Sequence, residues 1–331
     1  LVAVAADAER AGLMHVEFDG LNRARNVGEA RAALATLAMF PQNLTIGDAD
    51  GHVLYVRAGA TPRRPAGYDW TKPVPGNSSA TAWQGSLSID DLVQVADPEA
   101  GYLQNNNVAP DAMAATPPVD AARYAPDIFF DMPGRQTSRG ARTVAVLSAN
   151  AQMTLDDAMA LAFDEQWTTA EEWIAALRYA VAKRPRFVSK ASAAFREAVA
   201  RVEAFDGVAD KDSEAAADFY FWRKAANVFL AKFEDRWFVT HPWDEARFTP
   251  AFADALLKAL AQSIEDREAA YGTSRQKLGD VMRFTRGTAD APAGGVTLDS
   301  DLAPLCVELL RAVCERTMRA FGVAPLGDSG R

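Results

Sequence analysis

The spacing of apolar and polar residues divides the chain into a mixed first part and a long helical part. Residues 26–37 predict a helix, because Asn26 and Glu29 form a capping-box pair ahead of a run rich in Ala and Leu. Residues 42–59 have strand character on both sides of an Asp-Ala-Asp-Gly turn, which predicts a β-hairpin. Residues 60–85 are rich in Pro, Gly and Arg and predict a long loop.

From Thr154 the apolar spacing becomes helical and stays so through residue 271. The predicted helix starts are Thr154, Thr169, Ser213 and Thr249. Thr169 forms a capping box with Glu172, and Pro250 occupies the first helical position after Thr249. The large apolar residues in these helices indicate core packing rather than a cofactor site. They are Leu155, Met159, Phe163, Trp173, Leu177, Phe195, Val199, Val202, Phe219, Trp222, Ala226, Phe229, Phe233, Phe252, Leu256, Leu260 and Ile264.

Composition excludes several classes of partner. The 331 residues are 49% hydrophobic and carry a formal net charge of −9, which argues against nucleic acid or an anionic membrane surface. No apolar run approaches the length of a membrane-spanning helix. The chain begins with Leu1 and lacks a basic region before a long apolar core, so we expect its start to be an internal point of a longer chain.

The usual metal and nucleophile motifs are missing from the sequence. Cys306 and Cys314 are eight residues apart in one predicted helix, at 302–321, and both are expected to be packing residues. The three histidines form no HxxxH pair. The Asp48 turn lacks the acidic residue that closes a calcium-binding EF-hand loop. The motif Gly-Asp-Ser-Gly at 327–330 follows a helix and does not fit a trypsin-like protease.

Two stretches stand out as candidate binding or catalytic segments. The loop at 60–85 contains Tyr68, Trp70 and Trp83, which either line an apolar pocket or, as is more frequent, hold the loop against the body of the protein. Residues 104–107 read Gln-Asn-Asn-Asn within the segment DPEAGYLQNNNVAPD. Consecutive carboxamides are poorly suited to a packed strand or a helix, which indicates that they donate hydrogen bonds elsewhere.

The order of several segments resembles the β-subunit of the penicillin acylase family of N-terminal-nucleophile hydrolases. The similar pieces are QNLTIGDADGHVLYV, PRRPAGYDWTKPVPG, WQG and GYLQNNNVAP, then the pair Arg139 and Arg142, EAFDGVADKDSEAAADFYFW and LGDVMRFTRG. Phe205 replaces the usual Trp of the family, and Met282 stands where a His is common. The pattern QNxNxxP at 104–110 looks more like the acyl-homoserine-lactone and aculeacin acylase branch, because penicillin G acylases typically carry a Trp between the two asparagines.

The resemblance implies an α+β fold, namely part of an N-terminal-nucleophile hydrolase αββα sandwich with a long helical insertion. Residues 1–150 would form part of the core with the oxyanion-hole segment, 151–271 the helical insertion, and 272–331 a truncated return to the core. The missing remainder would be an upstream α-subunit and the N-terminal part of the β-subunit.

The resemblance also implies a mechanism. In this family an N-terminal Ser attacks an amide carbonyl with its own α-amino group as base, and no such nucleophile begins this chain. Alignment of GYLQNNNVAP makes Asn107 the side-chain donor of the oxyanion hole, and Arg139 the residue that orients the site. Alternatively, Asn107 caps a turn and Arg139 is a surface charge.

Further expectations follow from the family. The substrate would be a small acyl amide such as an acyl-homoserine lactone, a lipopeptide or a penicillin-like compound, and the location periplasmic or secreted. No cofactor is expected; a structural calcium is possible, but its ligands would lie mostly upstream, and the one expected here aligns with Trp70, which offers only a backbone carbonyl. Two other readings stay open: a non-catalytic homologue, and a hydrophobic-ligand binding module built on the loop aromatics.

Overall fold

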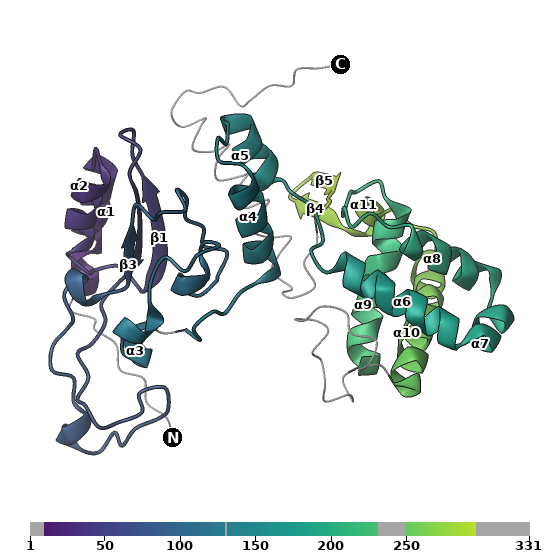
Figure 1. The fold of residues 1–331 in the computed structure, drawn as a ribbon, viewed down its shortest axis with the longest axis horizontal. Coiled ribbons are helices and arrows are strands. Elements are labelled where there is room, and N and C mark those ends of the chain that lie inside the picture. The colour runs from purple at the N-terminus through teal and green to yellow at the C-terminus, as the bar shows by residue number, and fades with distance from the viewer. Residues whose placement is uncertain (1–9, 130, 231–248, 296–331) are drawn as a thin grey trace. The chain divides into compact units, whose positions relative to one another are not determined.

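The computed structural model describes residues 10–129, 131–230 and 249–295. The chain divides into two compact units, Leu1–Leu161 and Ala162–Arg331. The first combines a small sheet with helices and long irregular segments, and the second is mainly helical (Figure 1). The predicted helix at 302–321, both cysteines, Phe233 and the motif at 327–330 lie outside the described residues.

The first unit is built on a three-stranded antiparallel sheet in the order β1-β2-β3. Its elements are the 3₁₀ helix η1 (Arg10–Leu13), α1 (Met14–Arg23), α2 (Val27–Leu34), β1 (Gln42–Gly47), β2 (Val53–Ala58), β3 (Gln94–Ala96), α3 (Pro126–Phe129), α4 (Ser138–Ala149) and α5 (Leu155–Ala162). Short 3₁₀ helices lie at Ser79–Thr81, Ile89–Asp91, Pro110–Ala112 and Ala121–Arg123. The predicted hairpin is confirmed, with Gln42 opposite Ala58 and Gly47 opposite Val53.

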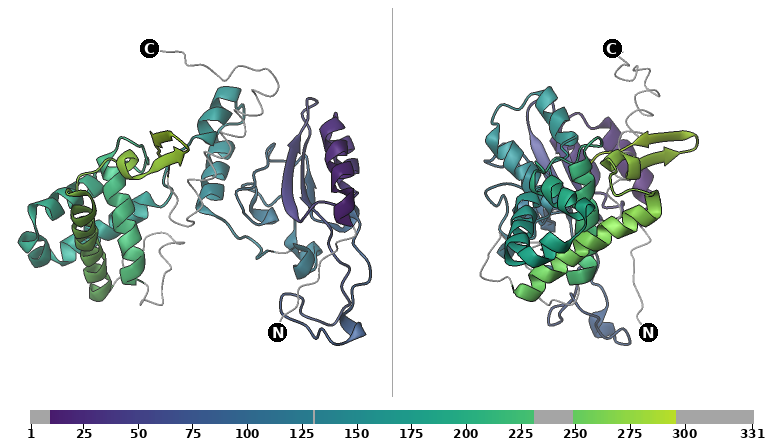
Figure 2. Two further views of the ribbon diagram at one scale, coloured as in Figure 1. Left: turned by 180° about the vertical axis from the view of Figure 1, so that it is seen from behind. Right: turned by 90° about the vertical axis from the view of Figure 1, so that its right-hand side faces the viewer.

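Strand β2 lies between two apolar layers because its side chains alternate across the sheet. Leu54 and Val56 pack with Leu34 of α2 on one face, where Figures 1 and 2 show α1 and α2 covering the strands. Tyr55 points to the other face and packs with Val108. The segment that follows β3 therefore forms the second cover of the sheet.

Helix α2 is shorter than the sequence predicts. Asn26 caps it as expected, since its Oδ1 accepts a hydrogen bond from the Glu29 backbone N at 2.8 Å. The Glu29 carboxylate, however, accepts from the backbone N of Arg25 at 3.0 Å, one residue before the position that a capping box requires. The helix ends at Leu34, and Leu37 adopts a left-handed φ of 53°, which is incompatible with continuation of the helix.

Within the described residues, the second unit contains four longer helices, two short helices and a hairpin. They are α6 (Ala170–Lys183), α7 (Pro185–Lys190), α8 (Ala193–Glu203), α9 (Glu214–Leu230), α10 (Pro250–Tyr271), α11 (Leu278–Val281), β4 (Arg283–Arg286) and β5 (Ala289–Pro292). Trp173 of α6 and Trp222 of α9 meet edge to face in the core, 5.5 Å between ring centroids. The predicted aromatic packing between these helices is thus confirmed for the described residues.

Helix starts in this unit follow the sequence except at α6. Ser213 accepts from the Ala216 backbone N at 3.0 Å, and Thr249 accepts from that of Phe252 at 3.2 Å, as predicted caps should. Thr169 makes no such bond, because its backbone (φ −105°, ψ 13°) is not in the extended conformation typical of a cap. The predicted capping box there is wrong.

One further expectation differs from the structure. Leu155, Met159 and Phe163 do not lie in a core: they are 77%, 41% and 59% exposed. No apolar cluster of the described residues includes them, so helical spacing alone misassigned this stripe. Residues 272–295 belong to the second compact unit, where the backbone N of Gly279 donates to Lys211 O at 2.7 Å, and the return of 272–331 to the hydrolase core stays a prediction.

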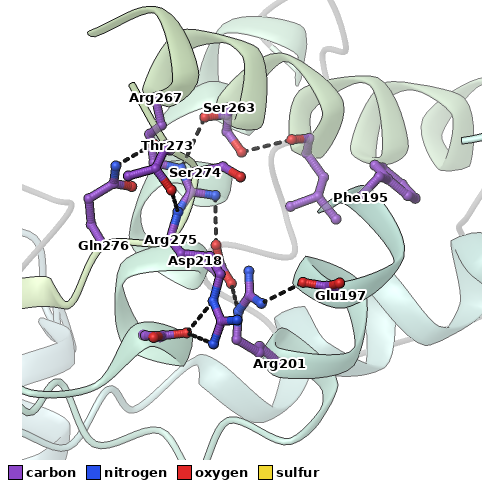
Figure 3. Close-up of polar contacts among 12 residues, drawn as sticks. Phe195, Glu197, Arg201, Asp218, Ser263, Arg267, Thr273, Ser274, Arg275 and Gln276 are labelled. Carbon is purple, nitrogen blue, oxygen red and sulfur yellow. Dashed lines mark hydrogen bonds and ion pairs between the residues drawn. The ribbon is translucent and has the colours of Figure 1, made fainter. Parts of the chain in front are cut away.

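A buried charge cluster joins three helices of the second unit (Figure 3). Asp218 of α9, 1% exposed, pairs with Arg201 of α8 at 2.5 Å and with Arg267 of α10 at 2.6 Å. Arg267 is also 1% exposed, and its Nε donates to Ser263 O at 3.1 Å.

Across the described residues, no helix is both long and apolar enough to cross a membrane.

Candidate active site

The segment after β3 turns back onto the sheet at Asp97. Asp97 has a left-handed φ of 43°, and its carboxylate accepts from the backbone N of Val53 at 2.8 Å. Downstream, Val108, Ala109 and Met113 are each at most 1% exposed and pack in the cluster that contains Tyr55. This apolar anchor places residues 104–107 at the border of the sheet's second face.

Three of the four consecutive carboxamides bind the segment to itself and to the sheet. Gln104 Oε1 accepts from both the backbone N and the Nδ2 of Asn106, each at 2.9 Å. Asn105 Oδ1 accepts from Asn43 Nδ2 at 3.3 Å. The Asn43 Oδ1 in turn accepts from the Tyr55 hydroxyl at 2.8 Å. Burial raises the pKa of Tyr55, so its phenol stays protonated and can keep this donor role at neutral pH.

Asn107 is the exception among the four. It is exposed, its φ is 58°, and its Oδ1 accepts a hydrogen bond from Arg139 Nη2 at 2.7 Å. A guanidinium has donors only, so it fixes the carboxamide with its oxygen toward Arg139 and its amino group turned away. No acceptor for the Asn107 Nδ2 is found among the described residues, so this amino group can donate to an oxygen outside the chain.

Helix α4 positions Arg139. Thr137 caps the helix by accepting from the backbone N of Gly140 at 3.0 Å, and Arg139 lies in the first helical turn. The Thr137 hydroxyl also donates to Asn106 O at 2.8 Å, and Asn106 Nδ2 donates to Thr143 Oγ1 at 3.0 Å. The structure thus brings the two sequence-predicted residues Asn107 and Arg139 together.

The segment that enters α4 is held by backbone bonds and an ion pair. The backbone N of Ala109 donates to Arg135 O at 2.9 Å, and that of Gly134 donates to the Asp111 carboxylate at 2.9 and 3.0 Å. Arg135 binds Asp131 through Nε and Nη2 at 2.5 and 2.7 Å, and this pairing lowers the pKa of Asp131. The position of Arg139 therefore rests on a fixed entry into α4.

Gly140 of α4 packs tightly against the segment that carries the carboxamides. A Cβ built on Gly140 would lie 2.3 Å from Val108 Cγ1 and 2.2 Å from Gln136 Oε1. Gln136 can move its flexible end, but Val108 is 1% exposed and stiff at χ1. A side chain at 140 would therefore push the first turn of α4 away from the segment that carries Asn107.

We expect Gly140→Ala to destabilise the protein by about 1–3 kcal/mol through overpacking, and to lower the amide hydrolysis proposed below by displacing Arg139. Thermal unfolding and steady-state kinetics measure both effects. Gly76→Ala is the matched control, because a Cβ at Gly76 meets nothing within 4 Å and its φ is not left-handed. Equal melting temperatures for the two variants would contradict the tight contact at Gly140.

Two of the loop aromatics contact each other and their own loop. Trp70 Nε1 donates to Pro65 O at 2.9 Å, its ring lies 5.7 Å from the Arg64 guanidinium, and Tyr68 meets it edge-on at 5.8 Å. Arg64 in turn pairs with Asp127 of α3 at 2.8 Å. These contacts indicate that Trp70 holds the loop in place. Trp83 is half-buried. A substrate pocket built by Tyr68, Trp70 and Trp83 stays a prediction.

A cavity of about 870 Å³ lies elsewhere in this unit, and none of those three aromatics lines it. Its walls include Tyr124, Phe129 and Asp131.

The described residues contain no cluster of three His, Cys, Asp or Glu side chains that could hold a metal ion. At the Asp48 turn the carboxylate accepts from backbone N atoms of Val27, Asp50 and His52 instead.

Sequence reasoning missed Thr137 and Thr143. A signal was present, since Thr137 precedes SRGARTVAVL, a run with a Thr cap and helical apolar spacing that predicts α4. The short strand β3 has no comparable signal, because three residues are too few to show a period of two.

The sequence and the fold were compared with those of known proteins. Its sequence matches the family Penicillin amidase over residues 6–306. Penicillin G acylase of Escherichia coli is 38% identical over 73 residues, which is 21% of this chain and 8% of that protein. A thermostable penicillin G acylase from Alcaligenes faecalis shares the fold with a TM-score of 0.51 and 15% identity, over 80% of this chain and 53% of the other.

The chain therefore spans about half the length of the solved relative. The expected mixed α and β fold of an N-terminal-nucleophile hydrolase is confirmed at this level, whereas the acyl-homoserine-lactone branch and the position in a β-subunit stay predictions. Because the family match covers most of the sequence, the chain belongs to the penicillin amidase family.

Proposed function

We propose that the full-length protein containing this chain is an N-acyl amide hydrolase, in which Asn107 donates a hydrogen bond to the oxyanion of the tetrahedral intermediate. The observation that carries this proposal is the Asn107–Arg139 pair. The guanidinium binds the carboxamide oxygen at 2.7 Å and so turns the amino group of an exposed residue outward. A neutral, preoriented N–H donor is the group that stabilises a developing oxyanion.

The proposed reaction requires a nucleophile from outside this chain, an N-terminal Ser upstream of Leu1. Its hydroxyl attacks the amide carbonyl and gives its proton to the α-amino group, which passes it to the leaving amine as the C–N bond breaks. Water then hydrolyses the acyl ester and releases the carboxylic acid. Asn107 contributes about 10²–10³ in rate, or about 3–4 kcal/mol, because its bond is strongest when the carbonyl oxygen is charged.

The substrate class that we propose is a linear acyl amide of the acyl-homoserine lactone, lipopeptide or penicillin-like kind. Asn106 supports the first two, because the pattern QNxNxxP places a carboxamide rather than Trp before Asn107, and that carboxamide is bonded to Thr143 at 3.0 Å. The partners would be an upstream α-subunit and the N-terminal part of the β-subunit, in a periplasmic or secreted protein. The proposal needs no cofactor; a structural calcium would depend mostly on upstream ligands.

The test uses the full-length gene product. Mass spectrometry of its mature chains is expected to find a Ser at the β-chain N-terminus. Assays for the free amine are expected to detect hydrolysis of N-acyl-homoserine lactones of graded chain length and of a phenylacetyl amide. A mature chain with no N-terminal Ser, Thr or Cys, together with no hydrolysis of either substrate, would contradict the proposal and leave a non-catalytic binding protein as the better interpretation.

A further inference from the structure

We propose that Thr137 is a positioning residue for this hydrolysis. Its hydroxyl fixes the peptide group between Asn106 and Asn107 and so keeps the Asn107 carboxamide directed at the reacting oxygen. This inference rests on the proposed role of Asn107. Thr137 is not expected to touch the substrate.

Asn107 needs such support because its conformation is unusual and its own contacts are few. Its φ of 58° lies in the left-handed region, which Asn tolerates better than most residues but still at a cost. Such a conformation persists where the surroundings determine it. Asn107 is exposed, and its side chain accepts a hydrogen bond from Arg139. Its backbone must therefore be held through the two peptide groups that flank it.

The C-terminal flank is fixed by burial. Val108 is 1% exposed and Ala109 fully buried, and the backbone N of Ala109 donates to Arg135 O at 2.9 Å. These contacts hold the Val108 side chain and the peptide group between Val108 and Ala109, on the C-terminal side of Asn107. They do not fix the rotation about the N–Cα bond of Asn107, which depends on the preceding peptide group.

The preceding peptide group is held by Thr137. Because the peptide unit is planar, the direction of the Asn106 carbonyl also sets the plane from which the φ of Asn107 is measured. That carbonyl oxygen accepts from Thr137 Oγ1 at 2.8 Å. From α4 as well, Thr143 Oγ1 accepts from Asn106 Nδ2 at 3.0 Å. The cap residue of α4 thus binds the backbone of Asn106, and a hydroxyl within α4 binds its side chain.

The bond to Asn106 is additional to helix capping. A cap needs only an acceptor, and the Thr137 oxygen fills that role for the backbone N of Gly140 at 3.0 Å. A hydroxyl has a single proton, and Thr137 directs it to Asn106 O. The same turn of α4 carries Arg139, which binds the Asn107 side chain. Thr137 therefore couples the backbone of Asn107 to the helix that orients its carboxamide.

The experiment compares equal substitutions at two helix caps in the full-length protein. Thr137→Val removes the cap and the bond to Asn106, whereas Thr249→Val removes a cap of the same kind on α10, where the hydroxyl accepts from the Phe252 backbone N at 3.2 Å. Both variants are expected to lose a few degrees of melting temperature. Thr137→Val alone is expected to lower kcat by about tenfold, with KM within about twofold, because misorientation affects the transition state.

Thr137→Ser keeps the hydroxyl and is expected to restore kcat to within about twofold. The inference would be overturned if Thr137→Val had the same kcat as Thr249→Val, or if Thr137→Ser were as slow as Thr137→Val. The proposed function would remain intact in either case, provided that Asn107→Gly still reduces kcat. An unchanged kcat in Asn107→Gly would instead overturn the role of Asn107 and, with it, that of Thr137. A crystal structure of Thr137→Val is expected to show Asn107 displaced from its left-handed φ or from Arg139, and an unmoved Asn107 would also overturn the inference.

Discussion

Asn107→Asp in the full-length protein should abolish most of the proposed activity without loss of stability. The carboxylate has the size of the carboxamide and can still accept from Arg139, so the exposed pair remains and the melting temperature should change little. It has no N–H to donate, however, and its negative charge faces the forming oxyanion. We expect kcat to fall by at least about 10²–10³ while KM changes little, as measured by steady-state release of the free amine.

Two neutral variants separate catalysis from backbone strain. Asn107→Ala and Asn107→Gly both remove the carboxamide, but Ala at a φ of 58° is strained by about 1 kcal/mol whereas Gly is not. We therefore expect Asn107→Gly to be the more stable of the two and both to be similarly slow. If Asn107→Gly kept the wild-type kcat, the residue would serve the turn alone, as in the capping alternative, and the oxyanion role would be refuted.

The pairing of Asn107 with Arg139 illustrates what sequence can and cannot predict. The two residues are 32 apart in the chain, and each could be named because it stands in a segment similar to the family. The hydrogen bond between them depends on where α4 begins and on the absence of a side chain at Gly140, and these are properties of packing. The β1–β2 hairpin was predictable for a different reason, since its strands and turn are local in sequence.

Packing also explains the failures. Leu155, Met159 and Phe163 have helical spacing as clear as that of Phe195, Val199 and Val202, yet only the second set lies in a core. Spacing shows that a helix has an apolar face and not what covers it. At Thr169 the cap residue type was correct, but the backbone conformation on which a cap depends is set by the preceding chain. For the aromatics of the 60–85 loop, composition does not show whether they line a pocket or hold the loop in place, so the pocket stays a prediction.

In the second unit, the largest loss of stability is expected from Asp218→Asn. Asp218 is 1% exposed and neutralises Arg201 and Arg267, which it meets at 2.5 and 2.6 Å (Figure 3). Asparagine can present its oxygen to one guanidinium, but its amino group then faces the other, and donors repel donors. Arg267, equally buried, would be left without a counter-charge, and breaking a buried ion pair in this way costs about 3–5 kcal/mol.

Glu214→Gln provides the matched control, because it makes the same chemical change on the same helix in a solvent-exposed pair. Glu214 meets Arg275 at 2.8 Å, with side chains 34% and 58% exposed, so its loss should cost no more than about 1 kcal/mol. Thermal unfolding followed by far-ultraviolet circular dichroism should show a large drop in the melting temperature of the helical signal for Asp218→Asn and almost none for Glu214→Gln. Similar shifts in the two variants would mean that water reaches Asp218, and that the second unit depends on its aromatic core around Trp173 and Trp222 rather than on the buried charges.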